Sequence, residues 1–272
     1  MNETYPVLEF QGEPDDFYIK YCSRKSDMGA EVFNSKLGRF IQSPVVDNNF
    51  ANITFDDKPS KQAAVSKTVK LDGYEYATLS EIIGRKLSKS RLYFHGDYQP
   101  GEKFCSSDID YISSFKINKL IGHYFKDAPE EFKAGLVDYY LFSELIQNAD
   151  QCMLNNVPAW AWSKDTKDMS RLKNAPALDF ADTDTFHSSE VFEKPINPRN
   201  FMWILKNYPN VVKSFMSRLD AIRGDGFKKL TDFKDVAEFF DGDEIITGER
   251  LQQGFRKRAV ALQNQFAVAK RL

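Results

Sequence analysis

Residues 147–156 have the sequence Gln-Asn-Ala-Asp-Gln-Cys-Met-Leu-Asn-Asn, and residues 175–180 have the sequence Ala-Pro-Ala-Leu-Asp-Phe. Asn155 thus follows Asp150 at a spacing of five, and Asp179 comes later in an apolar setting. Phosphoryl transfer needs an aspartate that orients a hydroxyl nucleophile, an asparagine that holds a metal ion, and a later aspartate that holds metal between the phosphates. The order of these three side chains is the order that this chemistry requires.

A lysine and a glutamate upstream fit the same chemistry. Lys20 ends the segment Phe-Tyr-Ile-Lys at residues 17–20, which predicts a strand, and Glu31 lies in the first turn of a helix predicted over residues 30–41. A long, flexible cation must be held in one rotamer, and a carboxylate on a neighbouring helix does this. In a kinase N-lobe, such a pair directs the lysine ammonium onto the α- and β-phosphates. Lys20 and Glu31 are therefore predicted to bind nucleotide.

Together these segments resemble the HipA-like serine/threonine kinases. In that family a strand lysine is followed by a helix that opens with Asn-Glu or Ser-Glu and closes with Leu-Ala/Gly-Arg, as residues 17–20 and 30–41 do in similar form. The second lobe of the family has a helix ending in a hydrophobic-x-Asn-x-Asp-x-His-x-x-Asn loop, then Ala-Pro-x-x-Asp. Residues 145–155 and 175–179 are similar to these motifs and come in the expected order.

The resemblance implies a role for each motif residue. Asp150 would be the catalytic base, while Asn155 and Asp179 would be magnesium ligands. Lys20 would bind phosphate, and Glu31 would hold Lys20 in place. ATP and Mg²⁺ are the cofactors that this assignment implies.

The resemblance also implies a fold and an activity. The fold is an α+β, two-lobed protein-kinase-like fold, with a small strand-containing N-lobe over residues 1–114 and a larger helical C-lobe over residues 115–272. The activity is that of a Ser/Thr protein kinase resembling HipA-like toxins, which transfers the γ-phosphate to a protein hydroxyl, with autophosphorylation as a further expectation. A protein substrate and a regulatory or antitoxin partner are implied as well.

Three positions leave alternatives open. Cys152 stands where the family has histidine, and Gly12 is the lone glycine before Lys20, where a glycine-rich flap would cover the phosphates. These departures favour, as an alternative, an inactive kinase-fold protein that acts by binding a partner. Asp182 lies close to Asp179 and is an alternative metal ligand.

A second region, residues 95–110, resembles the catalytic loops of other phosphotransferases. Residues 95–102 resemble the catalytic loop of choline or aminoglycoside kinases, although Glu102 stands where those enzymes have asparagine. Asp108 and Asp110 would share one face of a strand, which suits the two-metal site of a nucleotidyltransferase. A solvated loop between turns is the structural alternative for this stretch.

Composition limits the class of protein. The 272 residues are 42% hydrophobic and 28% charged, with 23 Phe and 12 Tyr, which is typical of a globular chain long enough for two packed lobes. The net charge of −2 makes nucleic acid an improbable partner. The sequence has three cysteines without a C-x-x-C pair, an N-terminus unlike an export signal, and no long apolar run. These features favour a cytoplasmic protein without a membrane-spanning segment.

The apolar spacing and the turn residues predict the remaining elements. Strands are expected at residues 7–10, 17–21, 45–46 and 51–55, and a polar, basic loop at 56–67. Helices are expected at residues 30–41, 74–87, 132–146, 198–205, 208–222, 233–240 and from 248 to the C-terminus, with an irregular stretch at 155–184. The last helix is amphipathic and basic, and docking on the larger lobe is preferred to a membrane or partner helix.

Overall fold

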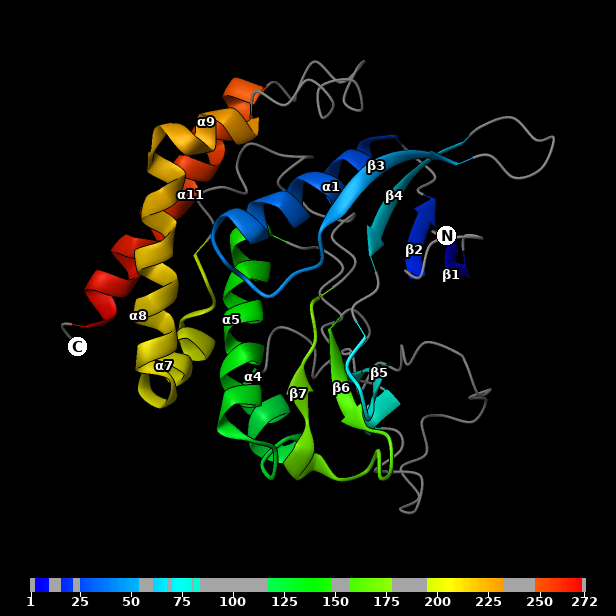
Figure 1. Ribbon diagram of the computed structural model, residues 1–272. Helices are drawn as coiled ribbons and strands as arrows, with labels where there is room; N and C mark the ends of the chain where they lie inside the picture. Colours follow the sequence, from blue (N-terminus) through cyan, green and yellow to red (C-terminus); the bar gives the residue numbers. More distant parts are fainter. Residues whose placement is uncertain are drawn as a thin grey trace, which may run out of the picture.

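The computed structural model describes residues 3–9, 16–21, 25–53, 61–67, 70–79, 81–83, 117–147, 157–177, 195–231 and 248–270. Over these ranges the chain forms an α+β fold with a strand-rich N-terminal part and a helical C-terminal part (Figure 1).

The N-terminal sheet has four antiparallel strands. In spatial order they are β1 (Glu3–Glu9), β2 (Asp16–Tyr21), β4 (Lys61–Lys67) and β3 (Asn48–Ile53). β2 is therefore an inner strand, and Lys20 lies opposite Ala64 of β4. An inner strand is hydrogen-bonded on both edges, so its backbone has no unpaired edge, and this fixes the position of the backbone that carries Lys20.

Helix α1 (Lys25–Phe40) lies between this sheet and the helical part (Figure 1). Val32 packs towards the sheet in a small cluster with Ala64. Phe33 and Leu37 belong to the main hydrophobic core. Because both sides of α1 are covered, the helix joins the two parts of the molecule.

The C-terminal part is built around one long helix, α5 (Glu130–Ile146), against which α8 (Pro209–Arg218) and α11 (Gly248–Ala269) pack (Figure 1). The other elements of this part are α4 (Ile117–Lys119), the π-helical turn η2 (Leu120–Tyr124), α7 (Pro198–Asn207), the 3₁₀ turn η6 (Leu219–Arg223) and α9 (Asp225–Thr231). In α11 the buried residues Leu251, Phe255, Ala259 and Leu262 recur at helical spacing. The last helix is thus docked on the core, as preferred from the sequence.

A second sheet ties distant parts of the sequence together. β5 (Tyr74–Thr78) pairs with β6 (Pro158–Trp162), which pairs with the short β7 (Lys173–Asn174), and the 3₁₀ turn η3 (Met169–Arg171) lies between the last two. The ring of Tyr76 meets that of Trp160 edge to face, with centroids 5.2 Å apart. This sheet joins the part of the chain that follows α5, which contains β6 and β7, to β5, which precedes α5 in the sequence.

Three element predictions were wrong. Residues 61–67 were predicted as loop but form the inner strand β4, because pairing with β2 on one edge and β3 on the other outweighs the polar ends of the segment. Residues 74–78 were predicted as helix but form β5, since pairing with β6 outweighs the local apolar spacing. The stretch 155–184 was predicted as irregular but contains β6.

Helix boundaries also differ from the predictions. α1 begins at Lys25, so Glu31 lies in its second turn and not in its first. The polar sequence before Ala30 hid this early start, because the apolar spacing begins only later. α9 was not predicted at all. The predicted helix 233–240 and the predicted lobe boundary near residue 114 lie outside the described residues.

Candidate functional site

Lys20 and Glu31 form a buried ion pair. Lys20 Nζ donates a hydrogen bond to Glu31 Oε2 at 2.8 Å, and Asn48 Nδ2 donates to the other oxygen, Oε1, at 2.7 Å. Glu31 is 2% exposed and Lys20 is 9% exposed. A buried carboxylate with both oxygens occupied has a fixed orientation, so it holds the lysine ammonium in one place.

The folding of α1 places Asn48 on Glu31. Ser35 lies one turn after Glu31 on the same face of α1, and its Oγ donates to the carbonyl of Val46. The same oxygen accepts a hydrogen bond from the Asn48 amide nitrogen at 2.8 Å. The hydroxyl thereby fixes the start of β3 against α1, with the Asn48 side chain directed at the carboxylate. Asn48 was missed from the sequence because it lies outside the motifs, and Ser35 was missed because the motif over residues 30–41 gives that position no role.

The segment after α1 approaches the chain that leads to Asp179. Val46 N donates to the carbonyl of Ala177 at 3.1 Å, and Ala177 N donates to the carbonyl of Pro44 at 2.9 Å. Val45 and Ala177 form a parallel bridge. Since Ala177 precedes Asp179 by two residues, the backbone carrying this predicted ligand begins next to the end of α1.

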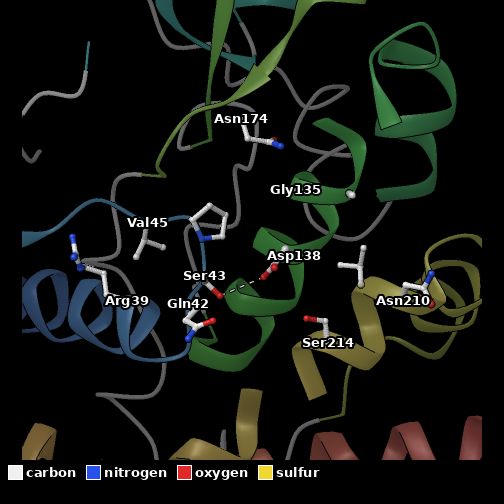
Figure 2. A pocket seen from close by; sticks show the side chains of 12 residues that line it. Arg39, Gln42, Ser43, Val45, Gly135, Asp138, Asn174, Asn210 and Ser214 are labelled. Carbon is white, nitrogen blue, oxygen red and sulfur yellow. Dashed lines mark hydrogen bonds between the residues drawn. The ribbon is translucent and has the colours of Figure 1, made fainter. Parts of the chain in front are cut away.

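A cavity of about 690 Å³ opens beside this junction. Figure 2 shows residues from separate parts of the chain around it: Ser43 and Val45 after α1, Asp138 on α5, Asn174 on β7 and Ser214 on α8. Ser43 Oγ donates to Asp138 Oδ1 at 3.3 Å, which is drawn as a dashed line. Burial raises the pKa of Asp138, while the Arg218 guanidinium and the Ser43 hydroxyl lower it. The cavity is thus bordered by groups that join α1 to the helices.

The C-terminal end of α5 is held by α11. Gln147, the residue that follows α5, has the left-handed backbone conformation, with φ of 51°. Arg258 of α11 is fully buried and donates from Nη2 to the carbonyl of Glu144 at 2.6 Å. Burial lowers the pKa of Arg258 to about 10, opposed by the charge of Glu144. A cation at a helix C-terminus stabilises the exposed carbonyl groups there. Asp150 lies three residues after Gln147 in the sequence.

The structure brings together Lys20 and Glu31 as the sequence predicted. Asp150, Asn155, Asp179 and the alternative ligand Asp182 lie outside the described residues. So do the residues of the competing interpretations, at 95–102, Asp108 and Asp110. Within the described ranges, no group of three or more His, Cys, Asp or Glu side chains is placed to hold a metal ion. No helix in those ranges is long and apolar enough to cross a membrane.

Solved kinase structures share this fold. The match to the Helicobacter pylori proinflammatory kinase CtkA has a TM-score of 0.53 and 12% sequence identity, and covers 97% of this chain and 94% of that chain. The match to a structure of the Shewanella oneidensis MR-1 toxin–antitoxin system, containing HipA, HipB and operator DNA, has a TM-score of 0.54 and 12% identity. That match covers 100% of this chain and 66% of the other, so this chain spans about two thirds of its length.

No protein-family model matches the chain, and no curated protein is significantly similar in sequence. The structural matches nevertheless define the class. The chain has an α+β, two-lobed kinase-like fold, as the sequence motifs predicted, and its structural neighbours include the predicted HipA and also CtkA.

Proposed function

We propose that this protein is an ATP-dependent Ser/Thr protein kinase that transfers the γ-phosphate to a protein hydroxyl. The observation that carries the proposal is the buried pair of Lys20 and Glu31, with the second Glu31 oxygen held by Asn48, on a fold shared with kinases. A purely structural ion pair at this depth would be a poor source of stability, because both charges lose their hydration. A fixed ammonium beside the sheet is instead suited to hold phosphate.

The residues present suit ATP at this position. When bound, ATP would supply the phosphoryl group, and Mg²⁺ would balance the charge of its phosphates. Lys20 would hold the phosphates, and Glu31 would keep its ammonium in place. Asp150 would orient the acceptor hydroxyl and take its proton, while Asn155 and Asp179 would hold the metal, with Asp182 as the alternative to Asp179.

Two features of the neighbours bear on the substrate and the partner. CtkA is described as a proinflammatory kinase, and the HipA structure belongs to a toxin–antitoxin system with HipB. On this basis the proposal extends to a protein acceptor, to autophosphorylation and to a regulatory partner of the antitoxin kind. A cytoplasmic location is part of the same proposal.

The proposal is tested by incubating the protein with Mg²⁺ and ATP labelled at the γ-phosphate. Wild type should label itself or a protein acceptor, and Asp150→Ala and Asp179→Ala should abolish the label while the protein stays folded. Asp72→Ala, in an exposed turn, is the matched control and should label as wild type does. Wild-type labelling by Asp150→Ala would remove that residue from the mechanism.

A kinase-shaped binding protein is the second candidate, favoured by Cys152 and by the lone Gly12 before Lys20. It predicts thermal stabilisation by Mg-ATP without any transfer of label. ATP labelled at the α-phosphate separates a third candidate, because a nucleotidyltransferase using Asp108 and Asp110 would transfer that label. A kinase transfers only the γ-label.

A further inference from the structure

One arginine from α8 holds the end of α1. Arg218 Nη1 donates to the carbonyls of Ile41 and Gln42, at 3.0 and 2.6 Å. Its Nη2 donates to Asp138 Oδ2 on α5 at 2.5 Å, and Ser43 donates to the other oxygen of that carboxylate. We call Arg218, Asp138 and Ser43 the α1 latch. It joins the helix that carries Glu31 to two helices of the C-terminal part.

The backbone at this helix end needs such support. Gln42 N donates to the carbonyl of Arg39, and Ser43 N donates to the carbonyl of Gly38, which is the Schellman pattern of a helix C-terminus. The left-handed residue in this pattern is usually glycine, but here it is Gln42, with φ of 59°. A side chain in this conformation costs about 1–2 kcal/mol. The two hydrogen bonds from Arg218 hold the carbonyl of Ile41 and the carbonyl of Gln42, which are the carbonyls before and after the left-handed backbone angles of Gln42.

The turn is also closely packed. A Cβ atom at Gly38 would come within 2.6 Å of the Val45 side chain, and within 3.0 Å of the Phe142 ring of α5. The chain therefore folds back tightly after α1 and passes against α5. Val45 and Val46 in the returning segment then contact Ala177 through the backbone. The segment that follows α1 is thus in contact with the segment leading to Asp179.

We infer that Arg218 is a positioning residue, which fixes α1 so that Glu31 and Lys20 keep their place relative to the segment leading to Asp179. Arginine suits this role because its planar guanidinium can bond two carbonyls and a carboxylate at once, whereas a lysine has a single nitrogen. A cation at the C-terminus of α1 is also favoured by the helix dipole. The consequence for ATP rests on the proposed function, while the effect on α1 does not.

The effect on α1 is tested by hydrogen exchange in wild type, Arg218→Met and Arg223→Met. Arg223 is a matched control, since its Nη2 donates to Gln263 of α11 and not to α1. Arg218→Met should raise amide exchange about tenfold or more over residues 39–47, as expected from lost charged hydrogen bonds. Exchange in α7 should stay unchanged, and Arg223→Met should leave residues 39–47 as in wild type. Equal amide exchange at residues 39–47 in Arg218→Met and Arg223→Met would overturn the inference that Arg218 holds the C-terminal end of α1.

The consequence for ATP is tested with the same variants. Arg218→Met should raise the Kd for Mg-ATP about tenfold, Arg218→Lys should lie between it and wild type, and Arg223→Met should bind as wild type does. Where transfer is measurable, KM for ATP should rise while KM for the protein acceptor stays constant. Should Arg218→Met fail to fold, Ser43→Ala removes a single bond of the latch and should shift exchange in the same direction.

The outcomes separate the two proposals. Faster amide exchange at residues 39–47 in Arg218→Met, together with an unchanged Kd for Mg-ATP, would overturn the positioning role of Arg218. No ATP binding by wild type would overturn the proposed function and the consequence for ATP, while the exchange experiment would still decide whether Arg218 holds α1.

Discussion

Lys20 and Glu31 are both buried, whereas Arg258 is buried and its partner Glu144 is partly exposed, and the two pairs are built differently. Lys20 Nζ lies 2.8 Å from Glu31, whose second oxygen accepts from Asn48. Arg258 Nη2 lies 4.0 Å from the nearest Glu144 carboxylate oxygen. Its Nε and Nη1 atoms are buried without a hydrogen-bond partner in the structure as described. In the first pair, both oxygens of the Glu31 carboxylate accept a hydrogen bond. In the second pair, the Nε and Nη1 groups of Arg258 donate none in the structure as described.

From this difference we infer a different role for each pair. A carboxylate whose two oxygens both accept hydrogen bonds holds a cation in one place, where a ligand could meet it, and this is the arrangement proposed for Lys20 and Glu31. The fully buried Arg258 is instead costly to keep charged, and its lowered pKa of about 10 reflects that cost. Its closest contact is the carbonyl of Glu144 near the end of α5. We infer that Arg258 stabilises the C-terminal end of α5 through this hydrogen bond more than it stabilises the fold through its ion pair with Glu144.

The largest effect is expected at Glu31. Glu31→Ala leaves the Lys20 ammonium buried without its carboxylate and should lower the free energy of unfolding by about 3–5 kcal/mol. Asp47→Ala is the control, because it breaks only the exposed pair with Arg39 and should cost less than about 1 kcal/mol. Urea unfolding measures both. A loss at Glu31 no greater than at Asp47 would show that the buried pair is not held as described.

A smaller effect is expected where α5 meets β7. A Cβ at Gly135 would come within 2.2 Å of the Asn174 amide, which donates to the carbonyl of Glu131 at 2.9 Å. Gly135→Ala should therefore cost about 1–3 kcal/mol from overpacking, which exceeds the gain in helix propensity. The double variant Gly135→Ala/Asn174→Ala should recover most of the loss in thermal unfolding. A single variant more stable than wild type would contradict this packing.

The pair of Arg258 and Glu144 should tolerate joint replacement. Arg258→Met/Glu144→Gln removes both charges together, and its free energy of unfolding should stay within about 1 kcal/mol of wild type. Hydrogen exchange at residues 143–147 should still increase, because the α5 carbonyl loses its cation. A loss of stability as large as that of Glu31→Ala would mean that the two pairs are energetically alike.

The smallest effect concerns pH and Asp138. Burial raises its pKa in the folded state, against the lowering effects of Arg218 and Ser43, with Arg39 lining the same cavity. The Asp138 carboxyl therefore binds a proton more tightly in the folded protein than in the unfolded chain. The stability contribution of Asp138 should be complete below its unfolded pKa and should be lost as pH rises through the raised folded pKa. Thermal unfolding of wild type against Asp138→Asn should show this slope in wild type alone. A wild-type slope of the opposite sign would contradict the assignment.

The sequence predicted what local motifs encode. Lys20 and Glu31 could be paired in advance, because a strand lysine and a helix glutamate form a known combination in ordered motifs. The docking of α11 could also be predicted, since its apolar face repeats over many turns. The kinase-like fold followed from these motifs in their order.

Long-range packing could not be read in the same way. β4 has polar ends and is a strand only because β2 and β3 pair with it on both sides. Asn48 and Arg218 act through partners far away in the sequence, and Arg218 contacts residues that precede it by 80 and 177 positions. No local pattern signals such contacts, so they come only from the three-dimensional structure.

The most direct test of the central claim is the affinity for Mg-ATP of wild type, Lys20→Met and Lys36→Met, measured by calorimetry. Lys36 is the matched control, because it lies on α1 and donates to Asn49 near the surface. The account predicts that wild type binds, that Lys20→Met binds about tenfold more weakly or worse, and that Lys36→Met binds as wild type does. Equal affinity in all three proteins, or no binding by wild type, would contradict the claim that Lys20 holds the phosphates of ATP.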